Sequence, residues 1–64
     1  MNLITASNLE SPDDFYAALL EAHEGFATEA SHALNARLVL ILANHIGSMT
    51  ILEQALAAAR AAAD

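Results

Sequence analysis

The sequence predicts an all-α protein, in which an antiparallel hairpin of two helices is closed by a short third helix. Apolar residues recur at helical spacing in three segments, expected at about 12–24, 29–46 and 50–62. Capping-type residues precede these segments, and a glycine follows each of the first two. The connections are only a few residues long, which makes successive helices antiparallel neighbours. With 64 residues, the chain forms a single small helical domain, 1–64.

The first helix has a well-marked start and end. Ser11 is suited to the N-cap, Pro12 to the first helical position, and Asp14 to the positive end of the helix dipole. Gly25 is the natural residue for a left-handed C-terminal cap. One apolar stripe, expected to be buried, is formed by Phe15, Ala18, Leu19 and Ala22.

The second helix is apolar on more sides than one small domain can cover. Thr28 is its expected cap and Gly47 its end. Segment 38–43 has no polar residue, so no side of it is suited to water. A buried strand is the alternative, but the chain offers no second strand to pair with it. Because two short helices cannot cover this segment, we expect part of it to contact another chain.

The third helix is expected to start near Ser48 or Thr50. Thr50 and Glu53 have the spacing of a capping box directly before an apolar run. The expected buried stripe consists of Leu52, Ala55, Leu56 and Ala59.

Composition narrows the classes of partner. Eight acidic residues oppose two arginines, for a net charge of −6, which disfavours nucleic acid and anionic membrane surfaces. No apolar run approaches the ~20 residues of a membrane span, and no signal peptide is recognisable, so a cytoplasmic location is expected. A chain this short has a marginal core, and without cysteine it cannot add disulfides. We therefore expect a homodimer or a larger protein partner.

The histidines offer the main alternative, a ligand- or metal-binding module. His23 and His32 are expected at the same end of the hairpin, where two imidazoles and a nearby carboxylate can bind zinc. A solvent-facing His32, and a His23 that interacts with the helix dipole, is the simpler expectation. A candidate polar site at the other end comprises Asn44, His45 and Asp13, and a core histidine at position 45 that closes this end of the bundle is the simpler expectation.

No catalytic arrangement can be assembled from this sequence. It has no nucleophile–base pair and no glycine-rich phosphate loop, and the chain is too small for a pocket of ~300 Å³ or more. We expect a protein that is not an enzyme and holds no cofactor or metal. The residues expected to bind a partner are Leu38, Leu40, Ile41, Leu42, Tyr16 and Arg37.

Four segments carry a resemblance to a known family. These are NLESPDDFY at 8–16, AHEG at 22–25, LNARL at 34–38 and LANHIG at 42–47. Together they resemble a short proteobacterial family catalogued only as a domain of unknown function, and the likeness extends over about 3–60. Genes of that family neighbour those of flavin-dependent oxidoreductases. The resemblance implies an accessory role beside such an enzyme, and no catalytic residue.

Overall fold

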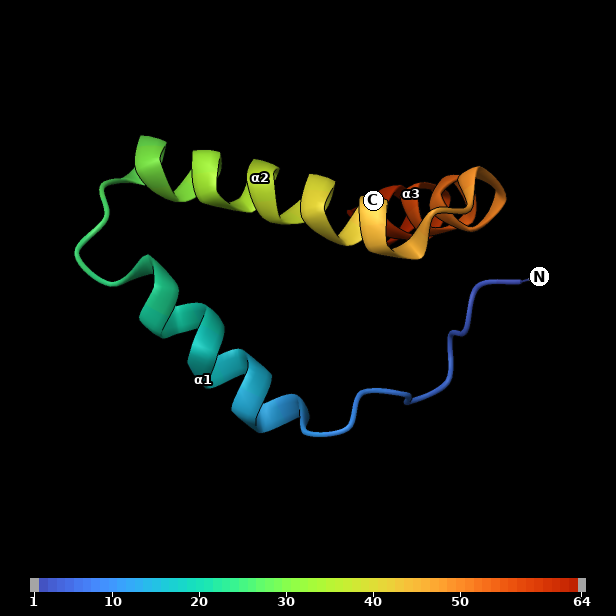
Figure 1. The fold of residues 1–64 in the computed structure, drawn as a ribbon, viewed down its shortest axis with the longest axis horizontal. Helices are drawn as coiled ribbons and strands as arrows, with labels where there is room; N and C mark the ends of the chain where they lie inside the picture. Colours follow the sequence, from blue (N-terminus) through green and yellow to red (C-terminus); the bar gives the residue numbers. More distant parts are fainter. Residues whose placement is uncertain (1, 64) are drawn as a thin grey trace.

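The computed structural model describes residues 2–63, with side chains described for 2–62. It contains three helices: α1 at Pro12–His23, α2 at Thr28–Ile46 and α3 at Met49–Ala63 (Figure 1). No strand occurs among the residues described. The predicted all-α class is therefore confirmed, and every helix boundary lies within one residue of its expected position.

A left-handed glycine ends α2 as predicted, because Gly47 is its C-cap with φ +73°. α1 ends differently: its C-cap is Glu24 with ψ 131°, and Gly25, with φ +80°, lies in the turn that the hydrogen bond from Phe26 N–H to the His23 carbonyl closes. The Gly47 N–H donates to the Ala43 carbonyl at 2.9 Å, which satisfies one of the carbonyls left free at the helix end. Glycine adopts this left-handed conformation without the steric cost that a Cβ atom imposes.

The starts of the helices differ from prediction in detail. Ser11 is the N-cap of α1 by position, but its hydroxyl makes no capping hydrogen bond; only its carbonyl accepts, from Phe15 N–H at 3.0 Å. Thr28 was expected as the cap of α2 and is instead its first residue. Ala27 occupies the cap position with an extended backbone, and its carbonyl accepts from Ser31 N–H at 3.0 Å.

The cap of α3 is Ser48, one of the two starts that the sequence allowed. Its hydroxyl accepts a hydrogen bond from Ile51 N–H at 3.3 Å, and its carbonyl accepts from Leu52 N–H at 2.9 Å. The capping box of Thr50 and Glu53 was wrong, because α3 is already helical at Thr50. The left-handed turn at Gly47 places Ser48 directly at the helix start.

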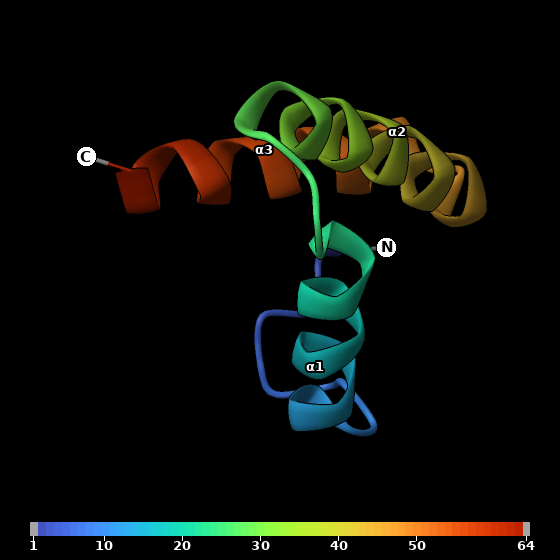
Figure 2. The same cartoon turned by 90° about the vertical axis from the view of Figure 1, so that its left-hand side faces the viewer.

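The three helices are arranged in an open form. α1 and α2 leave their connecting loop in divergent directions, and α3 turns sharply away from the end of α2 (Figures 1 and 2). Among the helices, α2 and α3 make the most extensive contact with each other. The segment 2–11 leads from α1 back to α3, where Leu3 N–H donates to Gln54 Oε1 at 2.7 Å.

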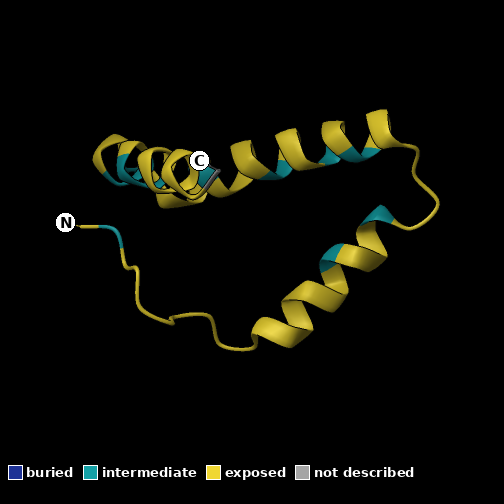
Figure 3. Ribbon diagram, turned by 180° about the vertical axis from the view of Figure 1, so that it is seen from behind, coloured by how far each residue is buried: buried dark blue, intermediate teal, exposed yellow. Residues whose placement is uncertain are grey.

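This open arrangement leaves the chain without a buried core. None of the residues described is buried, and twelve of them reach intermediate burial (Figure 3). The apolar stripes exist, but the prediction that they are buried was wrong for the single chain. Phe15 of α1 and Leu56 of α3 are exposed, and Leu19 is only partly covered, because the divergent helices do not lie against one another.

Two measures of size agree with this description. The radius of gyration is 13.3 Å, whereas a compact domain of this length has about 11 Å. The accessible surface is 5571 Å², compared with about 3,900 Å² for a compact monomer of 6.7 kDa. The single chain thus exposes about 1,700 Å² more than a closed fold of the same mass.

Candidate interaction surface

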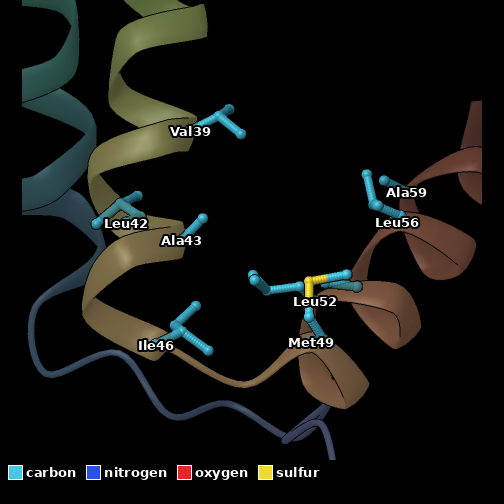
Figure 4. A pocket seen from close by; sticks show the side chains of 9 residues that line it. Val39, Leu42, Ala43, Ile46, Met49, Leu52, Leu56 and Ala59 are labelled. Atoms are coloured by element: carbon cyan, nitrogen blue, oxygen red, sulfur yellow. The ribbon is translucent and has the colours of Figure 1, made fainter.

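An apolar groove lies in the angle between α2 and α3, on either side of the turn at Gly47. Its volume is about 440 Å³, and apolar side chains from the two helices face each other across it (Figure 4). We call this groove and its walls the elbow surface. It is lined by Val39, Leu42, Ala43, Ile46, Met49, Leu52, Ala55, Leu56 and Ala59.

Helical periodicity accounts for both walls of the elbow surface. On α2, Val39, Leu42 and Ile46 recur at i, i+3 and i+7, so they share one face. On α3, the spacing i, i+4 and i+7 brings Leu52, Leu56 and Ala59 to the opposing wall, and all three belong to the expected stripe. The helices therefore meet with apolar faces that are only partly covered, and Leu42 is 47% exposed.

The side chains predicted to bind a partner lie on several different surfaces. Leu42 is the one that lines the elbow surface. Leu40 lies about 160° from Leu42 around the helix axis, on the outer side of α2. Arg37 shares that outer side, one turn earlier, and both residues are exposed. Leu38, at the start of segment 38–43, is partly buried.

The two remaining predicted partner residues are also exposed. Ile41 lies on α2 outside the elbow surface, and Tyr16 lies on α1. Segment 38–43 therefore presents apolar side chains in several directions, and the other elements described cover it only in part. The prediction that two short helices cannot cover this segment is consistent with the structure.

Sequence reasoning missed several residues of the elbow surface. Val39 and Ile46 were not among the expected partner residues, and Met49 carries no motif, yet all three line the groove. The signal is the apolar spacing read through the turn: the face that ends at Ile46 resumes at Met49 and continues to Leu52. That signal requires the geometry of the turn, which the pattern alone does not supply.

A second hollow of about 540 Å³ lies between the segment 2–11 and the joint of α2 and α3. Its lining combines apolar side chains with two asparagines: Asn2, Leu3, Ile4, Asn8, Ile46 and Ile51. The expectation that the chain has no room for a hollow of ~300 Å³ was wrong. Both hollows are open grooves, which a chain without a closed core can form at its surface.

His23 joins the end of α1 to the start of α2. Its Nδ1 lies 2.8 Å from Ser31 Oγ, and its Nε2 lies 3.0 Å from Asn35 Oδ1. With the Asn35 oxygen as acceptor, Nε2 carries a proton and donates it; in the neutral ring, Nδ1 then accepts from the Ser31 hydroxyl. The i, i+4 spacing of Ser31 and Asn35 places both on one face of α2, which is the signal that sequence reasoning missed.

The structure does not assemble the alternative cluster of His23 and His32. His23 directs both ring nitrogens to Ser31 and Asn35, while His32 is exposed. Within residues 2–62, no group of three or more histidine or acidic side chains is placed to hold a metal ion.

The candidate polar site is likewise not assembled. Asp13 lies in the first turn of α1, far from the last turn of α2 that carries Asn44 and His45 (Figures 1 and 2). Among the residues described, no hydrogen bond joins them. The divergence of α1 from α2 separates the two ends that a closed hairpin would bring together.

In the part of the chain that the structure describes, no helix has the length and apolar character needed to cross a membrane.

Comparison with known proteins identifies the family. No curated protein and no solved structure matches the chain. A family model described as a protein of unknown function, DUF2783, matches residues 3–61, nearly the whole chain. The protein belongs to this DUF2783 family.

Proposed function

We propose that this protein is a small, non-catalytic helical interaction protein whose core is completed by another protein chain. The observation that supports the proposal most strongly is the absence of any buried side chain within residues 2–62. Folding is driven by removal of apolar surface from water, and a chain that buries so little gains little from folding alone. Contact with another chain supplies the missing burial.

The amount of uncovered surface supports this interpretation. A compact domain of about 60 residues buries roughly 60% of the surface of its unfolded chain. An unfolded chain of 6.7 kDa exposes about 9,700 Å², so the observed 5571 Å² corresponds to burial of only about 43%. Contiguous apolar surface of this kind on a small protein is typical of an interaction site.

The chemistry of the hollows favours binding over catalysis. The elbow surface contains no side chain that can act as a nucleophile, acid or base. The second hollow adds only the amides of Asn2 and Asn8 to its apolar lining. General acid–base and nucleophilic catalysis both require a reactive group within reach of the substrate.

Two kinds of partner fit the proposal. One is a second copy of the chain. The other is a larger enzyme, and the resemblance noted above suggests a flavin-dependent oxidoreductase. In either case, the contact residues come from the exposed apolar side chains of α2 and α3.

The experiment that tests the proposal measures the mass of the protein in solution and the cooperativity of its thermal unfolding. We expect static light scattering over a hundredfold range of concentration to give either a mass above 6.7 kDa or a monomer that melts without a cooperative transition. Far-UV circular dichroism measures the melt on the same samples. A monomer at all concentrations with a sharp, cooperative melt would contradict the proposal, because the chain would then have a sufficient core of its own.

A further inference from the structure

The uncovered groove between α2 and α3 leads to a more specific inference, which rests on the proposed function. We infer that the elbow surface of one chain packs against the elbow surface of a second copy in a closed, two-fold symmetric dimer. The α2 and α3 helices of both copies then enclose one apolar core. Three observations carry this inference: the reach of α1, the distribution of charge and the area left exposed.

The chain cannot cover its own elbow with α1. At 1.5 Å per residue, α1 with 12 residues is about 18 Å long and α2 with 19 residues is about 28 Å long. The two are joined at the start of α2, where His23 also bonds Ser31 and Asn35. Even if α1 lay flat along α2, its far end would reach only to about residue 39 or 40, where the elbow surface begins.

The remaining segment of the chain covers a different side of the joint. Residues 2–11 border the second hollow, and Leu3 bonds Gln54 of α3. No residue of this segment lines the elbow surface. Neither α1 nor the segment 2–11 therefore covers the groove, and a second molecule is needed to close it.

The distribution of charge favours a second copy as that molecule. Five of the eight acidic residues lie between residues 10 and 24, on α1 and its flanks. The helices that form the elbow carry two acids, Glu29 and Glu53, and both arginines, Arg37 and Arg60, within the described residues, so these charges balance. The lining itself has no ionisable group. Two elbows can meet without like charges facing each other, while the acidic ends remain in solvent and favour solubility.

The exposed area matches what a stable dimer needs. The single chain exposes about 1,700 Å² more than a compact fold, which is about 3,400 Å² for two copies. Obligate dimers bury about 2,000–5,000 Å² in total, whereas a standard transient complex buries about 800 Å² per partner. A transient contact would cover only about half of this excess, which is counted over the whole chain, α1 and segment 2–11 included. A dimer in which folding and association are coupled covers more of it, beginning with the apolar walls of the elbow surface.

The shape of the surface is compatible with two-fold pairing. A two-fold contact uses the same patch on both copies, so the patch has to be self-complementary. A groove with two helical walls meets this requirement, because a wall of each copy can pack into the groove of the other. Four helices around one apolar core form a common, closed arrangement. Closure leaves no free elbow surface, so assembly stops at the dimer.

The test uses two leucines on the same helix. Leu42 lines the groove, and Leu40 is exposed on the outer side of α2, two positions away. The variants Leu42→Glu and Leu40→Glu add the same charge to the same helix on opposite sides. Light scattering and analytical ultracentrifugation of the full chain give the mass and the dimer dissociation constant. Circular dichroism at each concentration gives the helix content.

We expect the unmodified chain to have twice the monomer mass of 6.7 kDa, and helix content to fall with dissociation on dilution. Leu42→Glu should raise the dissociation constant by about a hundredfold or more, because a carboxylate would be buried among apolar side chains. Leu56→Glu, on the other wall, should act in the same way. Leu40→Glu should leave the dimer intact. If Leu42→Glu also loses helix, the contrast with Leu40→Glu still locates the interface.

Several results would overturn the inference, and they separate it from the proposed function. Equal dissociation by Leu40→Glu and Leu42→Glu, or an assembly larger than a dimer, would exclude elbow-to-elbow pairing. A monomer with a non-cooperative melt would refute self-association but leave the proposed function standing, with a different protein as partner. A monomer with a cooperative melt would refute both.

Discussion

The turn between α2 and α3 depends on Gly47, and replacing this residue tests how the elbow is formed. Gly47 has φ +73°, a conformation that costs an L-residue about 1–2 kcal/mol. A Cβ built on it would lie 3.8 Å from the Asn44 carbonyl oxygen, which is an ordinary contact. Gly47→Ala should therefore destabilise the fold by about 1 kcal/mol, from backbone strain alone. For a chain of this size, that corresponds to a fall in melting temperature of about 4–8 °C.

The chirality of the substituted residue separates strain from other effects. A chain of 64 residues can be made by chemical synthesis, which allows D-alanine at position 47. D-alanine adopts positive φ without strain and has fewer unfolded conformations than glycine, so it should stabilise the fold by about 0.4–1 kcal/mol. Thermal unfolding followed by circular dichroism, at one fixed chain concentration, measures both variants. Equal effects of the two epimers would refute the reasoning, because strain at positive φ must depend on chirality.

Three further predictions concern the proposed interface, the His23 contacts between α1 and α2, and the cap of α3. Leu56→Ala should weaken the proposed dimer by about 2–4 kcal/mol in sedimentation equilibrium, since Leu56 is 68% exposed in the single chain and full burial of a leucine contributes about 1.5–3 kcal/mol per copy. Leu40→Ala, at 69% exposed and outside the groove, should change it by less than about 0.5 kcal/mol, and equal losses would argue against the interface. His23→Ala removes two hydrogen bonds and should destabilise the fold by about 1–2 kcal/mol in urea unfolding. The exposed His32→Ala is its control, and an effect of the same size there would show that the His23 contacts do not matter. Ser48→Ala removes the α3 cap and should cost about 0.5–1 kcal/mol, with faster amide exchange in the first turn of α3; unchanged exchange would contradict the cap.

The secondary structure of this protein was largely predictable because its signals are local. Pro12 and the glycines at 25 and 47 act through their own backbone geometry, which does not depend on distant contacts. The choice between Ser48 and Thr50 as the cap of α3 shows the limit of this approach. Thr50 has an equally good capping pattern, and only the direction of the chain after Gly47 decides which hydroxyl meets a free N–H.

The candidate site was predictable only in part. An apolar run such as 38–43 indicates a helix that the rest of the chain covers incompletely, and Leu42, one of the predicted partner residues, lines the elbow surface. The pattern does not tell which of several apolar sides will face a neighbouring helix. Met49 became part of the groove because α3 leaves the turn at Gly47 at an angle to α2, and His23 met Asn35 because the loop after α1 brings the end of α1 beside the start of α2.

The sequence by itself determined the three helices, their ends and the excess of apolar surface on the second of them. These follow from backbone preferences and from periodicity, both of which act within a few residues. Only the tertiary structure decided that α1 diverges from α2, that no described side chain is buried, and that the uncovered surface gathers in the angle between α2 and α3. The reason is physical: the angles between helices depend on which apolar faces meet, and local backbone preferences and periodicity do not decide which of several apolar faces that will be.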